Sequence, residues 1–454
     1  MMARKLDRNS ILFFGGALVL FAVVQVLISV GVLTDYYSNI LRIGAVMAIV
    51  SLGLNLIYGF NGQFSLGQWG FYAIGAYAAA DLTYRWSKLH TANGVTVMLM
   101  AVLFVGLALW GLGRLLSRVR GLDILSAFGL YLVAVFAAVY LGVRVGGLLA
   151  EPVTGLLNAL PPKLASQMVF FVAVLLAGLV AAEVAYLFGL PVLTLGSDYF
   201  GIATLGFTII VKVLLDNSDT MFGFEEMKGA RGMIGIPHET TWAWVFIFLL
   251  AVVVITRNLL HSSEGRAVIS VREDEIAAKA MGIDVAKYKN LAFVIGSLFA
   301  GLAGALYAHI NGFLHPDNFN FIRSFDPMII IVFGGLGSVT GTIVASFGWA
   351  ILLEGVLRLF LPSGFETWRF VVYPLLLLIM MLLRPSGLLG SFELPFLKRI
   401  LPPLKVTTPA APLRSQATSP SAQVVGVAPS TVNLRVGTAC AAGNDPSSSA
   451  AITG

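Results

Sequence analysis

The chain has 454 residues, of which 58% are hydrophobic and 11% are charged, and its mean hydropathy is +0.88. A soluble domain carries an apolar share near half and a charged share near a quarter, so this composition excludes an ordinary soluble domain. Long apolar runs recur, and a run of about 18 or more residues is typical of a membrane-spanning helix. The excess of basic residues does not indicate nucleic-acid binding, because these residues lie between the apolar runs, where the positive-inside rule places them.

Residue types that usually carry catalysis or bind cofactors are sparse. The only cysteine, Cys440, excludes a disulfide framework or a cysteine-based metal site within the chain. The histidines show no metal-ligand spacing, and no Gly-Lys pair provides a P-loop for ATP. We therefore expect a chain that is not an enzyme by itself and binds no metal or cofactor. Its energy would come from a partner or from an ion gradient.

The apolar runs predict an all-α, polytopic membrane fold with about ten or eleven transmembrane helices. Two runs fit this pattern poorly. Residues 200–215 are short for a span, and residues 327–361 are too long for one span and are broken by GGLGSVTG. We expect a turn or an unwound helix there, which is tolerated at membrane depth only where protein or a water-filled path lines it. The expected spans are about residues 11–33, 40–60, 65–83, 95–113, 122–143, 167–190, 200–215, 242–257, 291–313, 327–361 and 369–383.

The basic residues predict how these spans are oriented. Arg4, Lys5 and Arg8 place the N-terminus in the cytoplasm. Alternation of the spans then places the loop near residue 163 and the loop 216–241 on the outer side, and the strongly charged residues 258–290 in the cytoplasm.

Three regions follow along the chain, with one loop inside the second. Residues 1–39 hold an N-terminal cytoplasmic segment and the first span, and residues 40–392 form the transmembrane domain. This domain contains the cytoplasmic loop 258–290. Residues 393–454 are rich in Pro, Ala, Ser and Thr, which predicts a disordered cytoplasmic tail.

Within the charged loop, SVREDEIAAKAMG carries the local signals of a short helix. Ser270 and Glu273 match the S-x-x-E capping box at a helix start. Glu275 and Lys279 are spaced for an i,i+4 ion pair, and Gly282 is placed to end the helix. We expect a single rod of about 11 residues, roughly 16 Å long.

The charges of this loop are balanced, with five acids and five bases between residues 264 and 289. A helix lying on a lipid surface would be basic on its polar face, so the balance favours docking to a protein. The alternative is a solvated helix that binds nothing. Four apolar residues fall near one face and are expected to pack on the chain's own spans: Ile269, Ile276, Ala280 and Ile283.

Polar residues also occur inside the apolar part of the chain. The stretch NGQFSLGQ has two interpretations: a turn between two spans at the cytoplasmic side, or part of a translocation path lined by Asn61, Gln63, Ser65 and Gln68. Glu183 is an isolated carboxylate well inside a span, and intramembrane charges are functional candidates by default. We include it among the path candidates.

Five stretches, in the same order, resemble the LivM-type permeases of branched-chain amino acid ABC importers. EGRAVISVREDEIAAKAMGIDVAKYKNLAFVIGSLFAGLAGALYA is similar to their cytoplasmic loop and following span. The others are LGLNLIYGFNGQFSLGQWGFYAIGAYAAA, LTLGSDYFGIATLGFTII, IIIVFGGLGSVTGTIVAS and LLRPSGLLG. The resemblance covers roughly residues 40–85 and 190–392. Residues 86–166 and the tail match poorly, and the loop 216–241 is longer than its counterpart in the family.

This resemblance implies a permease subunit in a bacterial inner membrane that moves Leu, Ile and Val. It implies four kinds of partner: a second, related permease subunit, two cytoplasmic ATPases that bind ATP and Mg, a periplasmic substrate-binding protein, and the lipid bilayer. The charged helix would be a coupling helix seated in a groove of an ATPase. The residues implied in that contact are Glu264, Gly265, Arg266, Arg272, Glu273, Asp274, Glu275, Lys279 and Gly282.

Two alternatives stay open from the sequence. The same family handles urea and short amides, so the substrate class is not fixed. An ion-coupled secondary transporter would need embedded carboxylates or a broken helix, and Glu183 and residues 327–361 are the features that support it. Dependence on ATP, as against an ion gradient, separates the two energy sources.

Overall fold

The computed structural model describes most of the chain up to residue 357. The described residues are 8–116, 124–193, 197–221 and 227–357, together with Leu375, Leu378, Ile379, Leu382 and residues 387–390, 393–394 and 396–397. The chain forms two compact units, residues 1–400 and 401–454. The second unit lies outside the described residues, as do nearly all of the expected disordered tail and most of the expected span 369–383.

Helices dominate the described residues, which confirms the predicted all-α class. Eight of these helices are long and apolar enough to cross a membrane. The long helices are α1 (Arg8–Ser29), α2 (Asp35–Leu54), α3 (Gln68–Leu89), α4 (Asn93–Leu116), α5 (Ile124–Asn158), α6 (Pro162–Val192), α7 (Ser197–Asp216), α9 (Trp242–His261) and α12 (Val285–Asn311). The shorter ones are α8 (Ser218–Met221), α10 (Ser263–Glu273), α11 (Glu275–Ala280), α13 (Phe325–Gly334) and α14 (Val339–Ala350).

Irregular helices and one small sheet complete the described fold. The π-helix η1 (Asn55–Phe60) continues α2, and the π-helix η5 (Ile351–Leu357) continues α14. The 3-10 helices are η2 (Gly229–Arg231), η3 (Pro316–Phe319) and η4 (Phe321–Ser324). Strand β1 (Met233–Ile234) pairs antiparallel with β2 (Phe313–Leu314), with Met233 opposite Leu314.

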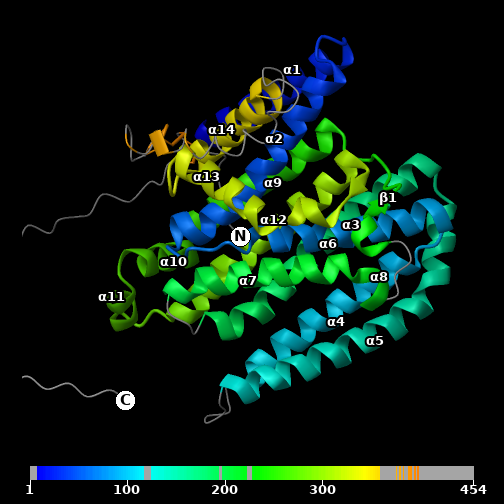
Figure 1. Ribbon diagram of the computed structural model, residues 1–454, viewed down its shortest axis with the longest axis horizontal. Helices are drawn as coiled ribbons and strands as arrows, with labels where there is room; N and C mark the ends of the chain where they lie inside the picture. Colours follow the sequence, from blue (N-terminus) through cyan, green and yellow to red (C-terminus); the bar gives the residue numbers. More distant parts are fainter. Residues whose placement is uncertain are drawn as a thin grey trace, which may run out of the picture. The chain divides into compact units, whose positions relative to one another are not determined.

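Helix α12 lies at the centre of the bundle, against α2, α3 and α6 (Figure 1). Glycines allow these backbones to touch, as is usual between membrane helices. A Cβ on Gly304 would lie 1.9 Å from the carbonyl oxygen of Tyr72, and one on Gly75 would lie 2.2 Å from that of Gly301. The contact between α12 and α3 therefore tolerates no side chain at these positions, which fixes α3 firmly on α12.

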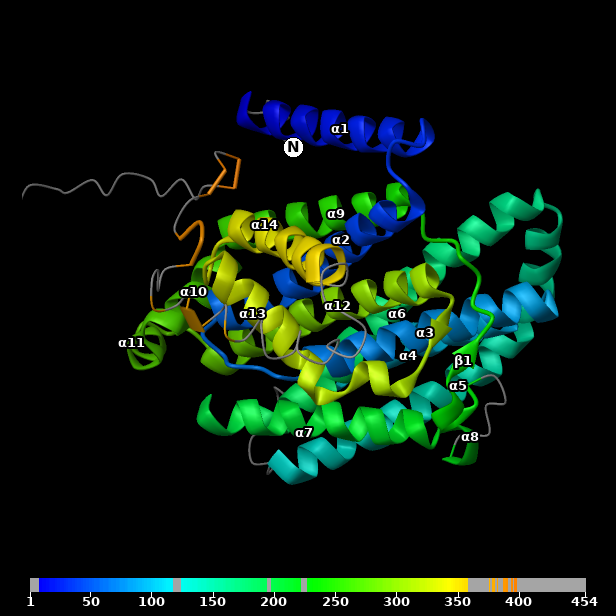
Figure 2. The same cartoon turned by 45° about the horizontal axis from the view of Figure 1, so that its top comes forward.

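The helices place two different sets of loops at opposite ends of the bundle, as Figures 1 and 2 show. We call the end with β1 and β2 the β end. There, the Glu239 carboxylate accepts hydrogen bonds from Ser166 at 2.6 Å and from Gln167, so the start of α6 and the loop before α9 share this end. The opposite end carries α10 and α11, and we call it the charged end. This grouping agrees with the predicted sharing of one side by the loops near 163 and 216–241.

The two runs that fitted the span pattern poorly have different outcomes. The expected short span at 200–215 is a helix of 20 residues, α7, and is long enough to cross a membrane. The expected break in residues 327–361 is confirmed as a turn, residues 335–338, between α13 and α14. Gly335 and Gly337 take positive φ angles of 113° and 81° there, where other residues would be strained.

The stretch NGQFSLGQ connects two helices, as its interpretation as a turn between spans expected: Asn61 lies in a turn and Gln68 begins α3. Residues 61–67 run without regular secondary structure between η1 and α3 and lie along α7, visible as the thin blue segment in Figure 2. The amide of Leu66 donates to Thr204 Oγ1 at 3.0 Å, and Thr208 Oγ1 donates to the Leu66 carbonyl at 3.1 Å. Irregular backbone is tolerated inside a membrane protein when neighbouring groups satisfy it in this way. The span expected from residue 65 therefore begins at Gln68.

Candidate functional site

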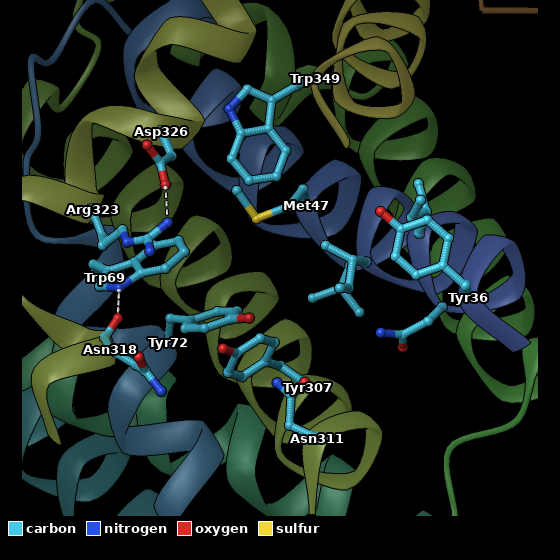
Figure 3. A pocket seen from close by; sticks show the side chains of 14 residues that line it. Tyr36, Met47, Trp69, Tyr72, Tyr307, Asn311, Asn318, Arg323, Asp326 and Trp349 are labelled. Carbon is cyan, nitrogen blue, oxygen red and sulfur yellow. Dashed lines mark hydrogen bonds and ion pairs between the residues drawn. The ribbon is translucent and has the colours of Figure 1, made fainter. Parts of the chain in front are cut away.

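A cavity of about 270 Å³ lies between α2, α3, α12 and the segment that leads into α13 (Figure 3). Its position is nearer the β end, because Tyr36 in the first turn of α2 and Asn311 at the last residue of α12 line it. The other lining residues are Asn39, Ile40, Ile43, Val46, Met47, Trp69, Tyr72, Tyr307, Asn318, Arg323, Asp326 and Trp349.

One wall of this cavity carries an ion pair. The guanidinium of Arg323 lies 3.5 Å from the carboxylate of Asp326, three residues further on. Asp326 is buried, with 1% of its surface exposed, whereas about a third of the Arg323 side chain is accessible. Both side chains line the cavity, and Arg323 is the more accessible of the two charged groups.

The remaining walls are aromatic and aliphatic. Trp69 stacks on Tyr72 with ring centroids 4.5 Å apart, and Tyr72 lies 5.5 Å from Tyr307. The indole of Trp69 is fixed by a 2.9 Å hydrogen bond from Nε1 to the carbonyl of Asn318. Ile40, Ile43, Val46 and Met47 supply the aliphatic wall from α2. Such a cavity suits a small molecule with an anionic group and an apolar body.

None of the polar residues predicted for a path lines this cavity. The four predicted residues are all buried in protein, along the segment that connects η1 to α3 and at its junction with α3: Asn61, Gln63, Ser65 and Gln68. Asn61 donates to the side-chain oxygen of Gln63 at 2.8 Å. The amide group of Gln68 has no hydrogen-bond partner among the described residues. Gln68 directly precedes Trp69, which does line the cavity. The place of these four side chains on a path stays a prediction.

Glu183 lies elsewhere. It lines two further cavities, one of about 610 Å³ between α3, α4, α5 and α6 and one of about 840 Å³ between α4, α6 and the start of α12. Neither shares a lining residue with the first. Its carboxylate faces Gly106 of α4. The described structure therefore does not bring Glu183 together with the other four path candidates.

The charged loop forms two helices, so the single expected rod is wrong. Ser262 begins α10 by accepting a hydrogen bond from the amide of Gly265 at 3.1 Å. Asp274 breaks the helix with extended backbone, and its carboxylate accepts from the amides of Ile276 and Ala277, both at 2.9 Å. A side chain that caps the next helix competes with continuation of the previous one. The expected capping box at Ser270 is also wrong, because Ser270 lies inside α10 and donates to the Ala267 carbonyl.

The far end of α11 is as expected. Gly282 has a φ of 82°, its amide donates to the Lys279 carbonyl at 3.0 Å, and the next amide, of Ile283, reaches back to the Ala278 carbonyl at 3.1 Å. This pair of bonds is the Schellman motif that ends helices at a glycine. Gly282 therefore has its predicted role as a helix terminator.

Side chains at the charged end pair differently from the sequence expectation. Glu275 pairs with Lys289 of α12 at 2.6 Å, not with Lys279, so α11 is held against the start of α12. Ile276 was expected to pack inward, but it is 83% exposed, and Met281 is 82% exposed. Gly265, Val268 and Val271 are the buried residues of α10. The charged end thus presents two large apolar side chains among charged ones.

Arg272 connects α10 to the interior of the bundle. Its guanidinium donates to the carbonyl of Gly59 in η1, and it packs against Gly337 in the turn between α13 and α14. The sequence placed Arg272 on a surface that meets a partner. The residue is exposed while its guanidinium also bonds to its own chain, so its contact with a partner stays a prediction. The S-x-x-E pattern gave no signal of the contact with Gly59.

Asn55 joins the same two segments, η1 and the turn between α13 and α14. Its side-chain amide donates to the Ser338 carbonyl and to Thr342 Oγ1, both at 3.0 Å, and its oxygen accepts from the amide of Gly337 at 2.9 Å. Asn55 is the first residue of η1 and is fully buried. These hydrogen bonds join η1 to residues 335–338, and we call the two segments the junction at the charged end. Irregular helical turns of this kind are frequent at functional sites.

Replacing Asp274 with alanine is expected to fray α11 while leaving α10 folded. Losing an N-cap costs about 1 kcal/mol, which corresponds to about fivefold faster amide exchange. Hydrogen exchange measured by mass spectrometry on the purified full chain, over residues 275–281, tests this. Glu273→Ala is the matched control, and equal exchange in both variants would contradict the capping role.

Comparison with known proteins adds a family to this geometry. The family model described as the permease component of the branched-chain amino acid transport system matches residues 36–148 and 124–381. The chain belongs to this family.

Two curated permeases are similar over most of the chain, and a third over part of it. The high-affinity branched-chain amino acid transport system permease protein LivM of Escherichia coli K12 is 29% identical over 380 residues, which is 77% of this chain and 69% of that protein. BraD of Pseudomonas aeruginosa, described in the same terms, is 23% identical over 359 residues, 78% of this chain and 95% of that protein. LivH of E. coli K12 is 28% identical over 180 residues, 39% of this chain and 55% of that protein. No solved structure matches the chain.

Family membership and the apolar helices together make this permease a multi-pass membrane protein. The family match begins at residue 36 and ends at residue 381, so it covers the cavity, η1, α10, α11 and the turn 335–338. Both the cavity near the β end and the junction at the charged end are therefore parts of the shared permease region.

Proposed function

We propose that this chain is the membrane-spanning subunit of an ATP-driven importer for branched-chain amino acids in a bacterial inner membrane. The observation that carries the proposal is the charged end, where two short, well-capped helices expose Ile276 and Met281 among balanced charges. An interface core of apolar residues with a polar rim is typical of a protein docking site. The family match and the LivM and BraD relatives support the substrate class.

In this proposal the partners are those implied by the family resemblance. Two ATPase subunits bind ATP and Mg and dock on α10 and α11, a second, related permease subunit completes the path, and a periplasmic protein delivers substrate to the β end. The charged end and the N-terminus face the cytoplasm. The contact with the ATPase involves Glu264, Gly265, Arg266, Glu273, Asp274, Glu275, Lys279 and Gly282, with Arg272 passing the motion inward.

The contacts at the charged end give a physical route for that motion. Movement of α10 pulls on η1 through Arg272, and movement of α11 pulls on α12 through the pair Glu275–Lys289. Helices moving as rigid bodies are a common form of switching. ATP-driven closure of the ATPases would in this way reach the helices that surround the cavity.

Replacing both Ile276 and Met281 with glutamate is expected to abolish binding of the ATPases, because charges would replace the apolar core of the contact. The test is co-purification of the ATPases with the tagged permease in mild detergent, after co-expression of all subunits. The matched control is Ile234→Glu, which alters a 59% exposed apolar residue at the opposite end. Retention of the ATPases by the double variant at wild-type level would contradict the proposal.

Energy coupling and substrate class need separate measurements. Uptake of leucine into proteoliposomes that hold the complete complex should require internal ATP and should persist when ionophores collapse proton and sodium gradients. Urea and short amides, added in excess, should not compete with leucine. Uptake driven by a gradient without ATP would favour the ion-coupled alternative, for which Glu183 is the candidate carboxylate.

A further inference from the structure

We infer that the 270 Å³ cavity is a binding site for the amino acid in transit, with Arg323 holding the α-carboxylate and α2 receiving the aliphatic side chain. This inference rests on the proposed function and adds the place where the substrate pauses in this subunit. Nothing in the similarity to known permeases assigns a ligand to these residues.

The size of the cavity fits a small metabolite. Cavities for drug-sized ligands measure about 300–1,000 Å³, and this one, at about 270 Å³, lies just below that range. Its lining combines several aromatic and aliphatic side chains with few polar ones, the usual composition of a site that binds an amphiphilic ligand. A purely polar ligand such as urea would have no apolar group to pack against most of these side chains.

Arg323 is suited to bind a carboxylate while it stays paired with Asp326. A guanidinium carries five N–H donors in a rigid fork, and a carboxylate is the group that this fork matches best. The buried Asp326 pairs with this side chain at 3.5 Å, as the dashed line in Figure 3 marks. We therefore assign Arg323 the contact with the ligand and Asp326 a positioning role.

The aromatic cluster completes the recognition of an amino acid. An α-ammonium group next to the bound carboxylate would lie near the rings of Trp69, Tyr72 and Tyr307, which group beside Arg323 in Figure 3. Aromatic faces attract cations within about 6 Å of the ring centroid. The aliphatic side chain would then extend toward residues of α2 that line the same cavity, such as Val46 and Met47.

The first test replaces Arg323 with glutamine in the complete complex, reconstituted in proteoliposomes with the ATPases and the binding protein. Losing a hydrogen bond to a charged group costs about 1.5–3 kcal/mol, so leucine uptake below saturation should fall about tenfold to a hundredfold. The matched control is Lys212→Gln. Lys212 pairs with Asp216 and Asp317 near the same end, at 2.8 and 3.1 Å, but does not line the cavity.

A second variant separates a binding role from a structural one. Met47→Phe reduces the volume of the cavity on its aliphatic side and leaves Arg323 and Asp326 unchanged. Leucine uptake should therefore fall more than uptake of the smaller valine. Each variant is checked for assembly by co-purification with the ATPases. An unchanged ratio of leucine to valine uptake, together with normal uptake by Arg323→Gln, would overturn the site. Failure of the wild-type complex to import leucine with ATP would instead overturn the proposed function.

Discussion

Replacing Arg272 with glutamine is expected to leave the ATPases bound to the permease but to slow ATP-driven leucine uptake at least about tenfold. The guanidinium ties α10 to the Gly59 carbonyl and packs on Gly337, so it bridges a surface helix and two interior segments. A hydrogen bond from a charged group contributes about 1.5–3 kcal/mol. Glutamine is shorter and uncharged, and it would release η1 from the motion of α10.

The measurement pairs ATP hydrolysis with leucine uptake in the same proteoliposomes. For Arg272→Gln we expect hydrolysis to continue while uptake falls, so that more ATP is consumed for each leucine imported. Lys287→Gln is the matched control, because Lys287 is an exposed cation in the first turn of α12 that stacks over Tyr288 at 5.2 Å. If both variants lose uptake equally, or if neither does, Arg272 does not transmit the motion.

The pattern of apolar runs and charges predicted which loops share an end of the bundle. Local helix signals predicted the details of the charged end poorly. The balanced charges of residues 264–289 correctly indicated a compact helical segment between two apolar helices. The pattern S-x-x-E at 270–273 pointed to a helix start, yet the helix begins eight residues earlier, at the Ser262 cap. The sequence does not decide whether Asp274 continues a helix or starts a new one. The burial of Val268 and Val271 decides where α10 lies.

The cavity could not be predicted from the sequence, because the residues that line it come from segments far apart in the chain. Tyr36, Trp69, Tyr307, Arg323 and Trp349 stand on different elements, and no local pattern in the sequence brings them together. The one signal present was an Arg and an Asp three residues apart just before an apolar run, at 323 and 326. Long-range helix packing, and not local pattern, brings that pair to face the aromatic cluster.

Asn55 is the second residue for which we expect a large effect, because it is buried and makes three hydrogen bonds across the junction. Replacing it with leucine, of similar size, leaves the amide of Gly337 without its partner and removes both donations to Ser338 and Thr342. A buried group left unsatisfied costs about 1–3 kcal/mol, and the lost bonds add to this, so we expect a loss of about 2–4 kcal/mol. The turn 335–338 would then separate from η1.

Thermal unfolding of the purified permease in detergent, at one fixed scan rate, measures this loss as a lower Tm. Thr342→Val is the matched control, because it removes one of the bonds to Asn55 but leaves those to Ser338 and Gly337 in place. We expect Asn55→Leu to lower the Tm by several degrees and Thr342→Val to lower it less. Since Arg272 contacts the same two segments, combining Asn55→Leu with Arg272→Gln should cost less than the sum of the single changes, because residues of one network do not act independently. Strict additivity would mean that Asn55 and Arg272 act separately and that η1 and the turn 335–338 do not move as one body.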